Sequence, residues 1–173
     1  MTILIIYSTI EGQTGKIVQA IHTNLQKAGH DVRIADAGNK TLELSFDGVD
    51  KVILAAPVHE RRHPKPFELL VTADAAALKA RQTLMVSVSL KAAFAETREE
   101  AQDFLDEMKL RTGLEPDAEM LVAGAVHPGY YDYYAEQILR HVILQGQDVD
   151  PHTEHEFTDW QALEAGVTAF VTA

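Results

Sequence analysis

The chain has 173 residues, no cysteine and a formal net charge of −11. This length is typical of one domain, so residues 1–173 are expected to form a single domain. The lack of cysteine excludes disulfides, thiolate metal sites and cysteine nucleophiles, and it favours a cytoplasmic protein. The acidity is concentrated in the second half, which argues against nucleic acid as a partner and allows at most a peripheral contact with the inner face of a membrane.

Short apolar segments alternate with longer amphipathic segments along the chain. The apolar segments predict β-strands at 4–7, 31–35, 52–56, 84–90 and 120–126. The amphipathic segments predict helices over 13–28, 66–78, 96–112, 131–145 and 159–172. Strands that are apolar on both faces and are separated by helices are typical of a parallel sheet. The sequence therefore predicts a doubly wound α/β fold, a five-stranded parallel sheet in three α/β/α layers.

The loop after the first predicted strand is rich in hydroxyl groups and glycine. It reads YSTIEGQTG over 7–15 and leads into a predicted helix. Glycine lets a ligand approach the backbone, and a helix N-terminus attracts anions. The loop lacks the glycine spacing of dinucleotide sites and the Gly-Lys-Ser/Thr ending of nucleoside triphosphate sites. A phosphate monoester held by Ser8, Thr9 and Thr14 is one interpretation, and an ordinary turn is the other.

The same loop resembles the phosphate loop of flavodoxins. The resemblance extends to the flavodoxin-like, menaquinone-dependent protoporphyrinogen oxidases and covers nearly the whole chain. The segments that carry it are YSTIEGQT at 7–14, SVSL at 87–90, AGAVHPGYYDYY at 123–134 and EHEFTDW at 154–160. It implies a flavodoxin-like fold with strand order 2-1-3-4-5 and FMN as the cofactor. It also implies a role in heme biosynthesis, in which protoporphyrinogen IX is oxidised to protoporphyrin IX and a quinone takes the electrons.

The resemblance further implies which residues bind FMN. The phosphate loop residues are Ser8, Thr9, Glu11, Gly12, Gln13 and Thr14. The flavin ring would lie between two further groups, Pro57, Val58 and His59 after the third strand and Ser87, Val88, Ser89 and Leu90 at the end of the fourth. A segment that long-chain members insert after the fourth strand would fall at about 91–117. We name no catalytic side chain, because the flavin carries the redox chemistry and the protein binds and tunes it.

Substrate contacts are expected at the same edge of the sheet. Arg61 and Arg62 belong to a basic cluster after the third strand, where they could bind an anionic substrate, although a solvated loop is an equally good interpretation. Tyr130 and Tyr131 could contact a planar substrate. The histidine pairs in the sequence lack a third ligand, so no metal site is predicted.

Two other functions remain open. The segment 96–119 is acidic, whereas members of the resembled family are rich in Lys and Arg there, and this lowers the number of cations available to porphyrinogen carboxylates. An acidic surface suits a soluble electron carrier that docks to a basic redox protein. The third interpretation is a flavodoxin-fold binding or regulatory protein without FMN. The sequence leaves the oligomeric state open, with a homo-oligomer among the outcomes.

Overall fold

The computed structural model describes residues 1–127 and 154–173. Its centre is a five-stranded parallel sheet with the order β2-β1-β3-β4-β5. The strands are Thr2–Tyr7 (β1), Asp31–Asp36 (β2), Lys51–Pro57 (β3), Gln82–Ser89 (β4) and Ala118–Ala123 (β5). The predicted strand order and doubly wound arrangement are confirmed.

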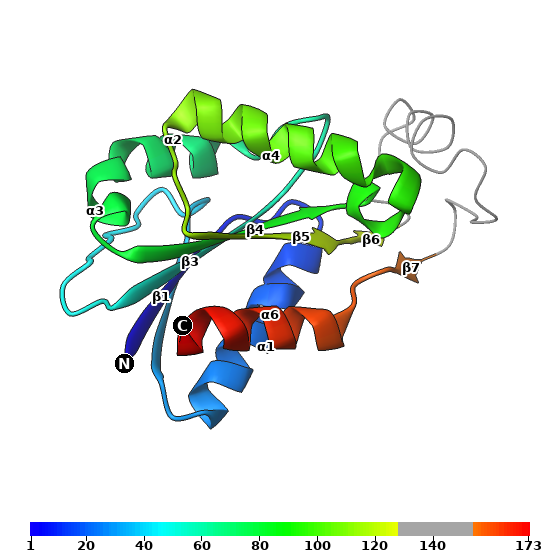
Figure 1. The fold of residues 1–173 in the computed structure, drawn as a ribbon. Helices are drawn as coiled ribbons and strands as arrows, with labels where there is room; N and C mark the ends of the chain where they lie inside the picture. The colour runs from blue at the N-terminus through cyan, green and yellow to red at the C-terminus, as the bar shows by residue number, and fades with distance from the viewer. Residues whose placement is uncertain (128–153) are drawn as a thin grey trace.

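Helices cover both faces of the sheet (Figure 1). One face carries α1 (Gln13–Lys27) and α6 (Trp160–Thr172), and the other carries α2 (Lys65–Ala73), α3 (Ala75–Lys79) and α4 (Arg98–Thr112). Successive residues of a strand point to opposite faces, so the sheet divides the core in two. Ile5, Ile53 and Val86 pack under α1 and α6, whereas their sequence neighbours pack under α2 and α4. This explains why the central strands are apolar throughout.

Two predicted elements are each divided in the structure. The predicted helix 66–78 is two helices, because α2 ends at Asp74, whose N–H donates to Leu70 O at 2.9 Å, and α3 starts directly afterwards. The predicted strand 120–126 breaks at Gly124. Beyond that glycine β6 (Ala125–Val126) leaves the main sheet and pairs antiparallel with β7 (His155–Glu156).

The expected insertion at 91–117 is wrong. This segment contains two short 3-10 turns, η1 (Lys91–Ala93) and η2 (Ala95–Thr97), followed by α4. A parallel connection from β4 to β5 requires such a crossover, so the segment belongs to the basic fold. The predicted helix 131–145 lies outside the described residues.

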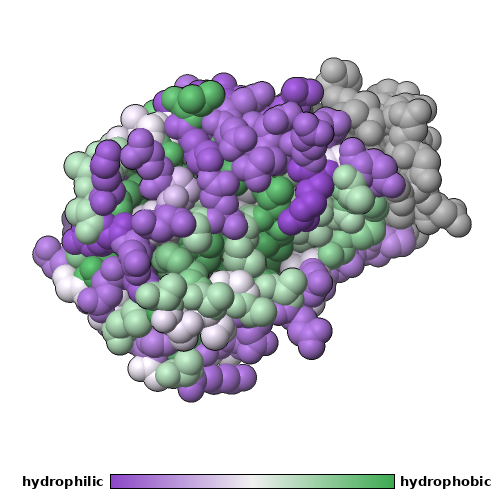
Figure 2. All heavy atoms as spheres, viewed as in Figure 1, coloured by the Kyte–Doolittle hydropathy of each residue, from purple (hydrophilic) through white to green (hydrophobic). Residues whose placement is uncertain are grey.

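The helical layers differ in their surface character. Figure 2 shows hydrophilic residues over α4 and a more hydrophobic band below it, over β5 and towards α6. α4 contributes five acidic and three basic residues. Within the two described ranges, no helix has the length and apolar character that crossing a membrane requires.

Candidate functional site

Three loops meet at the carboxyl edge of the sheet, because parallel strands end on the same side. They are residues 8–12 after β1, residues 58–64 after β3 and the chain that follows β4. Ser8 N–H donates to Ala55 O at 3.0 Å, and Val58 N–H donates to Val88 O at 2.8 Å. Residues expected from the sequence to bind one ligand are therefore neighbours at this edge.

The start of α1 has the geometry of an anion site. Gly12 caps the helix with φ 98°, a left-handed conformation that glycine adopts without steric cost, and its N–H donates to Thr9 Oγ1 at 3.1 Å. The first turn of α1 carries no acidic residue. The partial positive charge of the helix N-terminus is therefore not compensated within its own turn.

Several hydrogen-bond donors at this helix start are available to a ligand. Ser8 is 4% exposed and Thr14 is 2% exposed, and within the described part of the chain their hydroxyl groups form no hydrogen bond. The N–H groups of Gln13, Thr14 and Gly15 likewise donate to no described residue. A phosphate group would satisfy both hydroxyls and the three amides together.

The side-chain amide of Gln13 is held by the C-terminal part of the chain. Its Nε2 donates to Glu156 Oε2 at 3.2 Å and to Thr158 Oγ1 at 3.0 Å, so it faces the C-terminal segment and only its N–H remains for a ligand. Glu156 also pairs with Lys16 and accepts from Trp160 Nε1 at 2.7 Å. The hydrogen bonds from Lys16 and Trp160 lower the pKa of Glu156. The segment EHEFTDW thus fastens the C-terminal region to the start of α1.

Residues 59–62 after β3 form a tight turn. His59 N–H donates to Arg62 O at 2.8 Å, and Arg62 N–H donates back to His59 O at 3.1 Å. The two central residues, Glu60 and Arg61, have φ values of 48° and 68°. A two-residue reversal of this kind requires positive φ, and for residues other than glycine this strain costs about 1 kcal/mol or more each. Strain of this kind persists only where surrounding contacts hold it.

The first residue of this turn contacts the phosphate loop. His59 Nδ1 lies 3.6 Å from Glu11 Oε1, which connects the loops after β1 and β3. The N–H groups of His59 and Val58 are already used within the protein, so they are not donors to a ligand. Pro57 ends β3 beside them and is partly exposed.

His63, directly after the turn, is buried against β4. Its Nε2 lies 2.9 Å from Ser87 Oγ, and its Nδ1 has no partner. Burial lowers the pKa of His63 to about 4, with Glu68 and Arg111 acting in opposite directions. The imidazole is therefore neutral near pH 7. An unpaired acceptor is cheaper than an unpaired donor, so we assign the proton to Nε2, which donates to Ser87.

The end of β4 therefore offers little side-chain chemistry to a ligand. Ser87 is engaged by His63, and Ser89 Oγ accepts from Ala92 N–H at 3.2 Å. Val88 packs in the core under α1 and α6, and Leu90 caps the 3-10 turn η1. Any contact that these residues make with a flavin would come chiefly from their backbone atoms.

The two arginines of the basic cluster lie in different environments. Arg62 donates to Glu68 Oε2 at 2.9 Å, and Arg111 of α4 donates to Glu68 Oε1 at 2.6 Å. Burial alone would raise the pKa of Glu68, but the hydrogen bonds from Arg111 and Arg62 outweigh it and lower the pKa. Arg61 instead lies over the ring of Phe104, with Cζ 5.3 Å from the ring centroid.

Aromatic residues that the sequence did not single out also lie near this edge. The ring centroids of Phe94 and Phe157 are 5.4 Å apart in an edge-to-face contact with an interplanar angle of 67°, and Phe157 N–H donates to Gly124 O at 3.0 Å. Phe104 sits at a helical core position, so periodicity alone assigns it to packing. Tyr130 and Tyr131 lie outside the described residues. Across the described ranges, no three His, Asp or Glu side chains converge as metal ligands.

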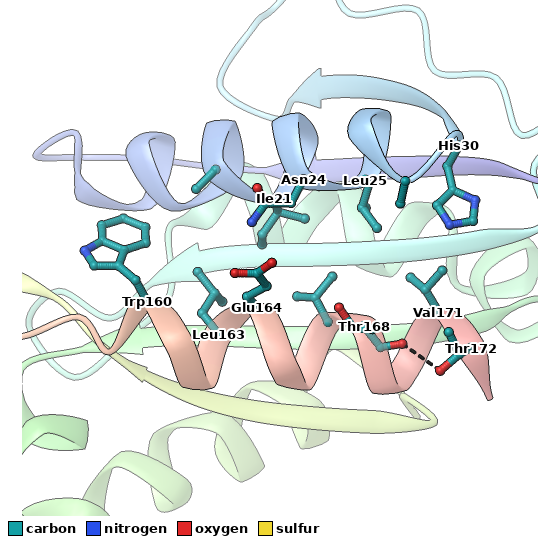
Figure 3. Close-up of a pocket in the computed structure, with 13 residues that line it drawn as sticks. Ile21, Asn24, Leu25, His30, Trp160, Leu163, Glu164, Thr168, Val171 and Thr172 are labelled. Atoms are coloured by element: carbon teal, nitrogen blue, oxygen red, sulfur yellow. Dashed lines mark hydrogen bonds between the residues drawn. The ribbon is translucent and has the colours of Figure 1, made fainter.

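A separate groove of about 330 Å³ lies between α1 and α6, on the opposite helical layer from Arg61 (Figure 3). Trp160 is at one end and His30 at the other, and Leu25, Leu163 and Val171 point into the space between the helices. Most of the residues that line it are apolar, and they pack α1 against α6. None of the predicted site residues lines it.

The comparisons with known proteins agree with this geometry. The sequence matches the flavodoxin domain family over residues 4–151, and the chain belongs to that family. It is 24% identical over 165 residues to a protein named protoporphyrinogen IX dehydrogenase (quinone) from Escherichia coli K12, covering 94% of this chain and 91% of that relative.

Solved flavodoxins share the fold. Oxidised flavodoxin 1 from Bacillus cereus has a TM-score of 0.60 and 14% identity, over 99% of this chain and 98% of its own. The Fusobacterium nucleatum flavodoxin bound to flavin mononucleotide has a TM-score of 0.52 and 14% identity, over 99% of this chain and 95% of its own. The predicted flavodoxin-like fold is confirmed, and FMN, the predicted cofactor, is confirmed as that of the family. The donors around Ser8 and Thr14 fit its phosphate.

Proposed function

We propose that this protein is an FMN-dependent oxidoreductase that oxidises protoporphyrinogen IX to protoporphyrin IX and passes the electrons to a quinone. The observation that carries the proposal is the cationic turn with Arg61 and Arg62 beside the loops assigned to the flavin. An enzyme whose substrate bears carboxylates needs cations at this position. The relative named protoporphyrinogen IX dehydrogenase, which aligns over nearly the full length of both chains, supports the same reaction.

In this proposal the residues of the chain bind and orient, and FMN supplies the electron-transfer chemistry when it is bound. Ser8, Thr14 and the amides at the start of α1 hold the phosphate. The loops after β3 and β4 flank the flavin ring, Arg61 of the turn faces the substrate carboxylates, and Arg62 holds the turn through Glu68. Tyr130 and Tyr131 remain proposed contacts to the planar substrate. No side chain needs to act as a catalytic base.

Turnover with the proposed substrate tests this function. FMN-loaded protein is mixed under anaerobic conditions with protoporphyrinogen IX and a soluble naphthoquinone, and the fluorescence of protoporphyrin IX is followed. We expect its rate of appearance to rise in proportion to enzyme concentration, above a control that contains free FMN at the same concentration. A rate equal to that control would contradict the proposal.

A soluble electron carrier is the second candidate, and the excess of acidic residues in α4 favours it. Figure 2 shows that the surface over this helix is hydrophilic. Part of this charge is balanced locally, since Asp106 Oδ1 lies 3.2 Å from Lys109 Nζ and Glu100 pairs with Lys91. A carrier would be reduced by a basic flavoprotein reductase at a rate that falls steeply with added salt. A salt-dependent reduction without porphyrinogen turnover would favour the carrier.

A further inference from the structure

Two cations from different loops converge on one buried aromatic ring at the edge of the proposed site. Phe104 of α4 is 3% exposed. Arg61 reaches it from the turn after β3, with Cζ 5.3 Å from the ring centroid, and Lys91 reaches it from the turn after β4, with Nζ 6.0 Å from that centroid. Because the ring is packed in the core, its position is fixed, and the cation–π contacts restrict the positions of both flexible side chains.

The charges around this ring do not balance. Lys91 is paired with Glu100, and its side chain is only 10% exposed. Arg61 is exposed, and it pairs with no carboxylate in the part of the chain that the structure describes. The group of Arg61, Lys91 and Glu100 therefore carries one unmatched positive charge. Contact with the Phe104 ring orients the guanidinium but cannot neutralise it.

The neighbouring Arg62 cannot supply this charge equally well. Its guanidinium is held by Glu68, whose side chain is 8% exposed and which Arg111 contacts from the other side. Moving Arg62 to a ligand would break a hydrogen bond to a largely buried carboxylate. Arg62 is therefore a positioning residue that helps to hold the strained turn, and Arg61 is the residue that the turn presents.

We propose that Arg61, held against the Phe104 ring beside Lys91, forms a subsite for one carboxylate of a planar substrate. This inference rests on the proposed function and names the residues that would recognise a propionate side chain. The guanidinium offers several N–H donors in a fixed plane, which suits a carboxylate. Lys91 contacts the same ring, but its charge is matched by Glu100. The single unmatched charge fits one carboxylate.

The test measures binding of the porphyrin product, so it does not depend on turnover. FMN-loaded wild type and Arg61→Asn are titrated with protoporphyrin IX and with its dimethyl ester, and porphyrin fluorescence reports binding. Asn is chosen because it adopts positive φ more readily than most residues, which protects the turn. Lys65→Gln is the matched control, because it removes an equal charge from an exposed position at the start of α2.

We expect Arg61→Asn to weaken protoporphyrin IX by about tenfold, the loss typical of one hydrogen bond to a charged group, and to leave the ester within about twofold. Lys65→Gln should bind both ligands as wild type does. Arg61→Lys, which retains the charge but not the planar set of donors, should bind protoporphyrin IX with an affinity between those of wild type and Arg61→Asn. Equal circular dichroism spectra and melting temperatures, together with retained FMN, verify that each variant is folded.

The outcomes separate the subsite from the function. If wild type turns over porphyrinogen and Arg61→Asn binds protoporphyrin IX normally, the subsite is overturned and the proposed function stands. An equal loss of the acid and the ester also overturns the subsite, because the missing contact would not be with a carboxylate. If wild type neither binds porphyrin nor turns over porphyrinogen, both proposals fail.

Discussion

Replacing Thr14 with Ala tests whether the helix start of α1 holds the FMN phosphate. Thr14 is 2% exposed, and its hydroxyl has no hydrogen-bond partner in the described structure. Its removal therefore breaks no described bond within the protein itself. The loss should appear almost entirely in the free energy of FMN binding and only weakly in the free energy of unfolding of the protein without ligand.

The expected magnitude follows from the kind of bond that is lost. A hydrogen bond to a charged acceptor contributes about 1 to 2 kcal/mol, so the FMN dissociation constant should rise by about 5- to 30-fold. The amides of Gln13 and Gly15 and the hydroxyl of Ser8 would still contact the phosphate, so binding should be weakened and not abolished. Riboflavin lacks the phosphate, and its affinity should hardly change.

The assay is a fluorescence titration of the apoprotein with FMN and with riboflavin, because flavin fluorescence changes on binding. Thr14→Ser is the matched control, since it keeps the hydroxyl and should bind FMN within about threefold of wild type. An equal loss of affinity for FMN and riboflavin in Thr14→Ala would refute the reasoning and place the phosphate elsewhere. So would a Thr14→Ser variant as weak as Thr14→Ala.

Three further predictions concern the cofactor and the contacts that hold the turn after β3. The purified or reconstituted protein should show flavin absorption bands and release FMN, not FAD, on denaturation, whereas a colourless protein that takes up no FMN would contradict both redox functions. The pKa of His63 is about 4 in the folded protein and 6.5 in the unfolded chain, so acid protonates the unfolded chain first. The free energy of unfolding should therefore begin to fall as the pH drops through 6.5, and this loss should be complete near pH 4. Urea denaturation should show wild type losing about 3 kcal/mol more than His63→Gln over this range, and parallel losses would exclude the buried neutral histidine. Glu68→Gln should lower the free energy of unfolding at pH 7 by about 2 kcal/mol, since two arginines lose their shared carboxylate, and an unchanged melting temperature would show that this cluster does not hold the turn.

The fold was predictable because its signals are local and repeat along the chain. Apolar runs of strand length alternate with helical patterns, and this alternation leaves few topologies for a parallel sheet. The predicted boundaries of two elements were wrong where a single residue ends a helix or a strand. Asp74 is the last cap of α2 and the first cap of α3, although the helical pattern of the sequence continues through it. Gly124 lies within a continuous apolar run, but beyond it the backbone pairs with β7 and no longer with β4. The insertion at 91–117 was implied by the resemblance to long-chain members, and it was wrong because this segment holds the crossover helix α4 that joins β4 to β5.

The candidate site was predictable in place but not in detail. Ser8, Thr9 and Thr14 follow a strand and precede a helix, so position and residue type together indicate the anion site. The contact between Arg61 and Phe104 could not be foreseen, because a phenylalanine with helical spacing is most simply a core residue. The pairing of Gln13 with Thr158 joins residues 145 positions apart, and no local pattern contains it.

Polar side chains at the carboxyl edge fall into two groups, and the division agrees with the roles proposed for them. Gln13, Arg62 and His63 each have a partner inside the protein, so their polar groups serve to fix loops. The side chains of Ser8, Thr14 and Arg61 have no hydrogen-bond or ion-pair partner among the described residues, so they are available to the ligands proposed for them. We expect a substitution in the first group to lower the free energy of unfolding more than the affinity for a ligand. We expect a substitution in the second group to lower the affinity more than the free energy of unfolding. The strained turn contains one residue of each group. The ion pair between Arg62 and Glu68 fixes the backbone of the turn, and Arg61 extends outward from that backbone.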